Sequence, residues 1–127
     1  MKSARIGYIN KADTASLSVS SQVLLAPVLR LQDPHVGVRW QSLSGSDWFV
    51  VDLGSVQAID CVRVMGLTAT TARIRYSATD PTMGEVADTG IVAVDQALLT
   101  LTDIRAVTAR YVRVDLTAPT YCAAGRV

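Results

Sequence analysis

An alternation of apolar and polar side chains with a period of two residues is the feature that most constrains what this chain can fold into. Ala72, Ile74 and Tyr76 are apolar, and arginines stand at the positions between them. Successive side chains of a β-strand point to opposite faces of the sheet, so this pattern predicts a strand with one buried and one exposed face. Residues 111–116 show the same alternation, and residues 61–65 show it more loosely.

Turn-forming residues separate these segments from other short apolar segments. Residues 48–53 are apolar on both faces, which predicts a central strand. The helix-like window at residues 95–101 is too short to change the fold class, and residues 23–29 allow one helical turn. The predicted strands cover residues 4–9, 48–53, 61–65, 71–78, 89–94, 97–101, 111–116 and 121–127. Many short strands between turns predict an all-β sandwich or barrel, and the lack of repeats and linkers predicts one domain over residues 1–127.

Length, hydropathy and charge limit the class further. The 127 residues suffice for one domain with its own core. The longest apolar run, residues 23–29, contains Pro27 and is too short for a transmembrane helix. The first residues lack the apolar stretch of a secretory signal, and the net charge of +1 gives no electrostatic reason to bind nucleic acid or a membrane. We therefore expect a chain that stays in the compartment where it is made and binds a neutral target.

The sequence offers little for catalysis or for a cofactor. His35 is the single histidine, and no Gly-x-Ser-x-Gly motif accompanies it. The 2 cysteines and 1 histidine are too few for a structural zinc site, and no calcium-loop or nucleotide-binding motif occurs. Cys61 and Cys122 could pair, but a chain that is not secreted normally keeps its thiols reduced. We expect a protein that is not an enzyme and has no metal and no cofactor.

Several short motifs follow one another in order along the chain. They are Trp40-Gln41-Ser42, the DWFVVDLG segment at residues 47–54, Ile59, Val62, Val64 and Gly66, the IRYS segment at residues 74–77, and the ARYVRV segment at residues 109–114. This ordered set, which spans residues 12–116, resembles the discoidin or coagulation-factor type C family. The resemblance implies an antiparallel jelly-roll β-sandwich of the galactose-binding-like kind, which agrees with the periodicity.

Two further pieces of sequence resemble a subgroup of this family, the small bacteriophage tail proteins. They are the LQDP segment at residues 31–34, which leads into the VRW segment at residues 38–40, and the VADTG segment at residues 86–90. This resemblance implies a virion subunit of a tail or tail tip, made in the host cytoplasm, that packs against other virion structural proteins and contacts host-surface glycans. The alternative is a freestanding, lectin-like carbohydrate-binding module.

The family resemblance also implies where a ligand binds. The loops at residues 28–39, 42–47 and 66–70 would gather at one end of the sandwich, where rigid sheets support them. These loops contain side chains that can donate to and accept from sugar hydroxyls. The candidate ligand-binding residues are Arg30, Asp33, His35, Arg39, Ser44 and Asp47.

Three other groups of residues have both a structural and a ligand-binding interpretation. Trp40 and Trp48 could stack on sugars, but the family pattern places both near the core. Asp52, in an Asp-Leu-Gly sequence, is expected to accept backbone hydrogen bonds in a turn. Outward-facing arginines could form a stripe for an acidic polysaccharide, but ion pairs with neighbouring aspartates are the favoured interpretation. The arginines are Arg63, Arg73, Arg75 and Arg113, and the aspartates are Asp60 and Asp115.

The carboxyl-terminal segment is expected to close the sandwich incompletely. Residues 121–127 read as a strand, but the chain lacks the terminal cysteine pair of secreted relatives and ends where the closing strand should finish. An unpaired sheet edge invites another chain. The sequence therefore predicts self-association or assembly into a larger complex.

Overall fold

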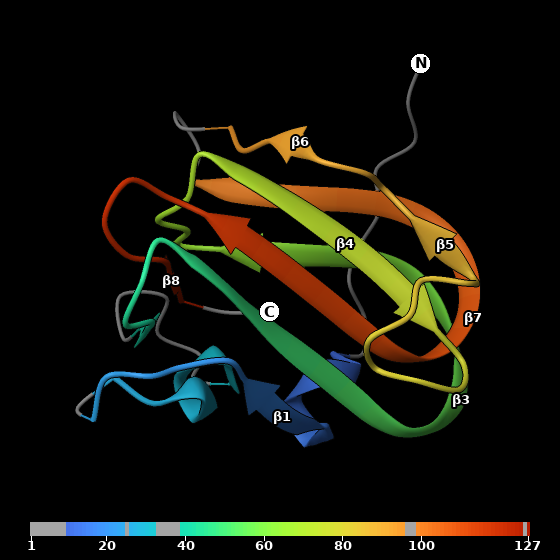
Figure 1. Ribbon diagram of the computed structural model, residues 1–127. Helices are drawn as coiled ribbons and strands as arrows, with labels where there is room; N and C mark the ends of the chain where they lie inside the picture. Colours follow the sequence, from blue (N-terminus) through green and yellow to red (C-terminus); the bar gives the residue numbers. More distant parts are fainter. Residues whose placement is uncertain (1–9, 25, 33–38, 96–98, 126) are drawn as a thin grey trace.

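The computed structural model describes residues 10–24, 26–32, 39–95, 99–125 and 127 (Figure 1). Within these residues the regular elements are β-strands and two short 3-10 helices, which confirms the all-β class. No helix among them is long and apolar enough to cross a membrane. In chain order the elements are η1 (Lys11–Thr14), β1 (Ser16–Val19), η2 (Val28–Gln32), β2 (Trp40–Gln41), β3 (Ser46–Met65), β4 (Thr71–Ser77), β5 (Ala87–Asp88), β6 (Val92–Ala93), β7 (Thr100–Thr117) and β8 (Ala123–Ala124).

Two long, bent strands form the frame of the sandwich. The main sheet has the order β1-β3-β7-β4-β5, with β6 also paired to β4, and β2 pairs with β8 in a second, small sheet. All pairings of these strands are antiparallel. Strands β3 and β7 pair along nearly their whole lengths, with irregularities between Asp52 and Gln57 and between Ile59 and Cys61. At these irregularities both strands curve, so their two halves lie in different layers (Figure 1).

The alternation predicted from the sequence decides which side chains enter the core. Ala72, Ile74 and Tyr76 of β4 are buried, as are the apolar residues at alternate positions of β7. The second half of β3 and the first half of β7, which pair with each other, contribute from the other layer. The core members from β3 and β7 are Phe49, Val51, Ile59, Val62, Val64, Leu101, Ala109, Val112, Val114 and Leu116. The period-two prediction is therefore confirmed for residues 71–76 and 111–116, whereas β4 ends at Ser77, which is itself buried.

Trp40 is the largest fully buried side chain. Its ring meets that of Phe49 edge to face, with the ring centroids 5.7 Å apart. Its Nε1 donates to the backbone carbonyl of Ser21 at 3.0 Å, so the one polar group of the indole has a partner. The prediction that Trp40 belongs to the core is confirmed.

A buried polar contact joins the two halves of the sandwich. The hydroxyl of Tyr76 donates to the carboxylate of Asp103, which lies in the first half of β7. Burial raises the pKa of the Tyr76 phenol, and the neighbouring carboxylate raises it further, so the phenol remains a donor.

The carboxyl-terminal segment differs from its prediction. Of the described residues in this segment, 121–125 and 127, only Ala123–Ala124 form a strand, because the backbone groups of this segment bond to several different segments. Cys122 exchanges hydrogen bonds with Ser42, the Gly125 N–H donates to the carbonyl of Met65 at 2.8 Å, and the Val127 N–H donates to the carbonyl of Leu31 at 3.2 Å. The expectation of an unpaired closing edge is therefore wrong for the described residues, and self-association remains a prediction that this edge does not support. Cys61 is exposed and Cys122 is buried, and both are free thiols.

Other segments of the chain differ from the strand prediction or lie outside the described residues. Strand β1 lies in the polar stretch at residues 11–22, where no strand was expected; serines there alternate with half-buried Leu17 and Val19. The strand expected at residues 89–94 is reduced to β6, and Gly90, with a φ of 68°, lies between β5 and β6. The strand expected at residues 4–9 and part of the one at residues 97–101 lie outside the described residues.

Candidate functional site

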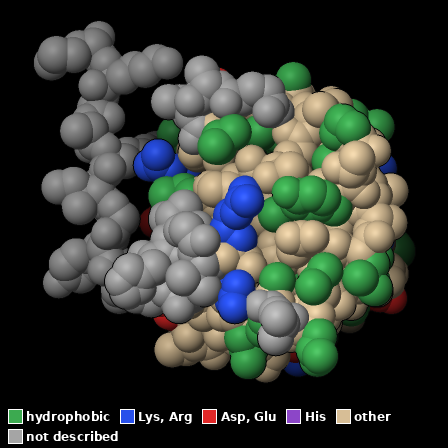
Figure 2. Space-filling view, turned by 90° about the vertical axis from the view of Figure 1, so that its left-hand side faces the viewer, with side chains coloured by type: hydrophobic (Ala, Val, Ile, Leu, Met, Phe, Trp, Pro, Cys, Tyr) green, Lys and Arg blue, Asp and Glu red, His purple; other side chains and the backbone are tan. Residues whose placement is uncertain are grey.

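Three segments far apart in the sequence meet at one end of the sandwich. The Ala118 N–H donates to the carbonyl of Gly45, the Ser42 N–H to that of Cys122, and the Thr68 N–H to that of Ala123, each at 2.8 Å. We refer to residues 42–45, 66–70 and 118–122, with the adjoining Arg30 and Arg39, as the loop end. It lies opposite the curve of β3 and β7 (Figure 1), and Figure 2 faces it directly. The predicted gathering of the second and third loops is thus present.

Arg30 and Arg39 are the predicted site residues that the structure brings together. Arg39 is half-buried, and its Nη1 donates to Thr68 Oγ1 at 2.9 Å and to the carbonyl of Gly66 at 3.5 Å. The Nη1 of Arg30 donates to the carbonyl of Arg39 at 3.5 Å. Figure 2 shows basic side chains on this face with hydrophobic side chains around them. Two guanidinium groups are therefore held in place at the loop end. Asp33 and His35 lie outside the described residues.

Ser44 and Asp47 serve the loop itself. The carboxylate of Asp47 accepts from Ser20 Oγ at 2.5 Å, from Ser44 Oγ at 2.7 Å and from the Ser44 N–H at 3.1 Å. Burial raises the pKa of Asp47, but the hydrogen bonds from serines, Ser20 first, together hold it below its usual value of 3.8. Asp47 is only 7% exposed. The expectation that it is a solvent-facing loop residue is wrong, because Ser20, from the end of β1, covers it.

We expect Asp47→Asn to lower the unfolding free energy by about 1–2 kcal/mol, because hydrogen bonds to a charged acceptor are stronger than neutral ones. The asparagine amide nitrogen also cannot accept from Ser44. Urea unfolding at neutral pH measures the loss. The matched control is Asp13→Asn, which removes the same charge in η1, where the carboxylate is exposed. An Asp47→Asn variant as stable as this control would contradict the structural role.

Apolar surface at the loop end comes from residues that the sequence analysis did not select. Tyr121 is half-buried in the segment after Pro119, and Leu43 is 69% exposed in the loop before β3. Tyr121 was assigned to a closing strand, although the preceding Ala118-Pro119 turn could have indicated a loop. An aromatic ring and a leucine at the same end of the sandwich as the two arginines offer the apolar contact that the C–H face of a sugar needs.

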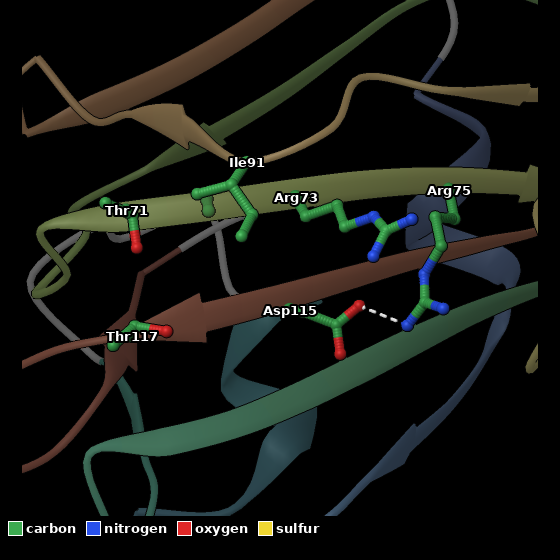
Figure 3. Close-up of a pocket in the computed structure, with 7 residues that line it drawn as sticks. Thr71, Arg73, Arg75, Ile91, Asp115 and Thr117 are labelled. Carbon is green, nitrogen blue, oxygen red and sulfur yellow. Dashed lines mark hydrogen bonds and ion pairs between the residues drawn. The ribbon is translucent and has the colours of Figure 1, made fainter.

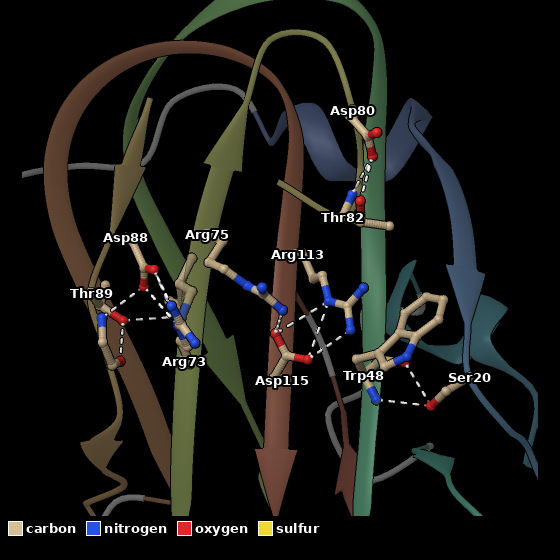
Figure 4. Close-up of polar contacts among 12 residues, drawn as sticks. Ser20, Trp48, Arg73, Arg75, Asp80, Thr82, Asp88, Thr89, Arg113 and Asp115 are labelled. Carbon is tan, nitrogen blue, oxygen red and sulfur yellow. Dashed lines mark hydrogen bonds and ion pairs between the residues drawn. The ribbon is translucent and has the colours of Figure 1, made fainter. Parts of the chain in front are cut away.

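The outer face of the main sheet carries a row of charged side chains that ends at Trp48 (Figure 4). Trp48 is half-buried, and the guanidinium of Arg113 lies 4.5 Å from its ring centroid. Arg113 Nη2 donates to Asp115 Oδ1 at 3.0 Å, and Arg75 Nη2 donates to Asp115 Oδ2 at 2.7 Å. The prediction that Trp48 belongs to the core is wrong, since the neighbouring Phe49 takes the inward position and places Trp48 on the outer face.

The predicted ion pairing of outward-facing arginines with Asp115 is confirmed, but the other aspartate that takes part is not the predicted one. Arg73 donates from Nε to Asp88 Oδ1 at 2.9 Å, so Asp88 of β5 rather than Asp60 is the second acidic partner. The hydrogen bonds from Arg73 lower the pKa of Asp88 to about 2. Arg63 lies in the second half of β3 and is not part of this row.

Asp52 has the structural role expected of it. Its Oδ1 accepts from the Gly54 N–H at 2.8 Å, and the φ of 83° at Gly54 suits a glycine. Arg110 Nε donates to the same oxygen at 2.9 Å and is the main cause of a lowered pKa of Asp52. This contact fixes the bend of β3 at the end opposite the loop end.

Within the described residues, no group of three or more His, Cys, Asp or Glu side chains could hold a metal ion.

The outer face of the main sheet, which carries the charged row, also contains a small cleft of about 200 Å³ (Figure 3). Residues from β4 and the end of β7 form its floor, and Ile91 forms one wall. Its lining residues are Thr71, Ala72, Arg73, Arg75, Ile91, Asp115 and Thr117.

Comparison with known proteins places this fold. The family model of the F5/8 type C domain matches residues 14–127. Among solved structures, the lectin domain of lectinolysin, complexed with Lewis b antigen, is 20% identical with a TM-score of 0.80 and covers 95% of each chain. A Streptococcus pneumoniae fucose binding module is 17% identical with a TM-score of 0.78, and covers 98% of this chain and 96% of that one. The chitosan-binding module 1 of a chitosanase/glucanase from Paenibacillus sp. IK-5 is 26% identical with a TM-score of 0.69, and the match covers 94% of this chain and 96% of that one. A search of curated proteins found no match. These likenesses confirm the galactose-binding-like sandwich.

Proposed function

The chain belongs to the F5/8 type C domain family, and from this premise we propose that it is a non-catalytic carbohydrate-binding module whose binding surface is the loop end. The observation that carries the proposal is the fixed guanidinium of Arg39, held by Thr68 Oγ1 and the Gly66 carbonyl. A donor that is held in place loses little conformational entropy when it binds a sugar hydroxyl.

The loop end has the mixture of groups that saccharide binding needs. Arg30 and Arg39 donate hydrogen bonds, and Tyr121 and Leu43 offer apolar surface. Because the net charge is +1, electrostatics gives no reason to expect a strongly anionic polymer at this surface. We therefore propose a neutral oligosaccharide as the ligand class.

The names of the compared structures support this reading over the virion subunit. They are a lectin domain complexed with Lewis b antigen, a fucose binding module and a chitosan-binding module. We infer that the lectin-like alternative fits the chain better than a tail or tail-tip subunit. Location in a virion and virion structural partners remain predictions from the sequence. Mass spectrometry of purified particles tests them, because a structural subunit is present in fixed copy number.

A glycan-binding experiment with matched variants tests the proposal. Wild-type protein is applied to an array that includes Lewis b, fucose and chitotriose, and the affinity for each bound glycan is measured by calorimetry. Arg39→Gln should weaken binding at least about tenfold, as expected for a lost hydrogen bond from a charged donor. Arg105→Gln is the control, because Arg105 is a half-exposed arginine in the first half of β7. Absence of binding by the wild type, or equal weakening by the two variants, would contradict the assignment.

A further inference from the structure

The cleft on the outer face of the main sheet has a composition different from that of the loop end. Figure 3 shows Arg73 and Arg75 from β4 and Asp115 from β7 around it, with Ile91 above and the hydroxyls of Thr71 and Thr117 at one side. None of these residues belongs to the loop end. The cleft is therefore a separate place where a ligand could bind.

Hydrogen-bond donors exceed acceptors in and around this cleft. Both oxygens of Asp115 already accept, Oδ1 from Arg113 and Oδ2 from Arg75 and Arg113. Arg73 directs Nε and Nη2 to Asp88, which leaves Nη1 without a described partner. Arg75 Nε is buried and has no hydrogen-bond partner among the described residues. Three guanidinium groups thus share two carboxylates, which gives the row a net charge of +1.

Size and shape limit what the cleft can accept. Its volume of about 200 Å³ is below the roughly 300 Å³ at which sites for drug-sized ligands begin, so it has room for a single ring or acid group. Ile91 is 77% exposed and gives the cleft one apolar wall. Thr71 and Thr117 have side-chain hydroxyls at the end of the cleft away from Arg75. An occupant with one anionic group, hydroxyls and an apolar face would match all three kinds of surface.

We propose that this cleft is a second saccharide site, which binds a sugar ring that carries a carboxylate, such as a uronic acid. The carboxylate accepts from the guanidinium of Arg73, which is 40% exposed, and the C–H face of the ring packs on Ile91. The proposal extends the proposed function by adding a site with a different ligand class. It does not depend on which neutral glycan the loop end binds.

Titration of the full chain by two-dimensional ¹H–¹⁵N NMR tests the second site, with glucuronic acid as the probe. Glucose and acetate, at matched ionic strength, are the reference probes. Glucuronic acid should shift amides of the cleft, those of Arg73, Ile91 and Asp115 included, whereas glucose and acetate should shift them several-fold less. Arg73→Gln should weaken glucuronic acid binding about tenfold, and Arg73→Lys less, because lysine keeps the charge but loses the planar fork. Arg105→Gln is the matched control, since Arg105 is 39% exposed and also ion-paired, and it should change nothing.

Each alternative outcome overturns a defined part of the proposal. Equal shifts with glucose would overturn selectivity for the carboxylate, and equal shifts with acetate would overturn recognition of the sugar. Equal weakening by Arg73→Gln and Arg105→Gln would mean that only the overall charge acts. Arg39→Gln separates the two sites, because it should weaken binding of array glycans at least about tenfold while cleft shifts with glucuronic acid persist. Loss of the cleft shifts in Arg39→Gln would overturn the independence of the second site.

Discussion

Replacement of Trp40 by alanine is expected to lower the unfolding free energy by about 3–5 kcal/mol, the usual range for a large aromatic removed from a core. Trp40 has no exposed surface, packs edge to face on Phe49 and satisfies its N–H with the Ser21 carbonyl. The alanine would leave a cavity where β2 pairs with β8, and it would remove the donor to the Ser21 carbonyl. A loss of this size is a large part of the total stability of an ordinary domain. Urea unfolding, followed by circular dichroism, measures it.

Trp48→Ala is the control, because it removes the same side chain from the outer face. Trp48 is half-buried, and its ring contacts the guanidinium of Arg113, an interaction worth about 0.5–1 kcal/mol at an exposed site. The loss should therefore be smaller than for Trp40→Ala by at least about 2 kcal/mol. If the two variants lost equal stability, the assignment of Trp40 to the core and Trp48 to the outer face would be wrong.

These two tryptophans show what the sequence could and could not predict. In β4 and the second half of β7, charged residues alternate with apolar ones, so the buried face was evident from the sequence. In residues 48–53 both faces are apolar, and alternation cannot tell which set points inward. The structure decides it by pairing β3 with β7 so that Phe49 lies opposite the buried Val114. That register depends on a strand more than fifty residues away in the sequence.

The length of β3 and β7 was also beyond local analysis. Gly54 and the polar residues around it read as a turn that ends a strand. In the structure the chain bends there but continues to pair with β7 as far as Met65, so two predicted strands are halves of one. Bends of this kind require a partner strand that curves with them. A partner so distant in sequence gives no local signal.

The candidate site residues also show what the sequence could predict and what depended on tertiary contacts. Arg30 and Arg39 lie in a loop that the family resemblance indicated, and they meet at the loop end. Asp47 had the same polar character but is covered by Ser20, a contact that spans 27 positions in the sequence. The Arg73–Asp88 pair joins β4 to β5, a short strand that the sequence did not predict. Residue type therefore indicated hydrogen-bonding capacity, and tertiary contacts decided which groups remain free for a ligand.

Gly45→Ala is expected to lower the unfolding free energy by about 3 kcal/mol or more, at the upper end of the range for overpacking. A Cβ added at Gly45 would lie 2.3 Å from the carbonyl oxygen of Ala118, and a backbone atom cannot move aside as a side chain does. The two segments would have to separate, which breaks the hydrogen bond from the Ala118 N–H to the Gly45 carbonyl. Urea unfolding again measures the change.

Gly84→Ala is the matched control, since a Cβ there would meet side-chain carbons of Arg75 at 3.1 Å and beyond, which need to move only a few tenths of an ångström. Its cost should stay within about 1 kcal/mol, partly because alanine reduces the conformational entropy of the unfolded chain. The pair also tests the loop end, because Gly45 joins two of its segments. At a temperature where both variants remain folded, Gly45→Ala should bind array glycans more weakly than the wild type, and Gly84→Ala should bind them equally well. Normal glycan affinity in a folded but destabilised Gly45→Ala protein would mean that the binding surface lies away from residues 42–45 and 118–122.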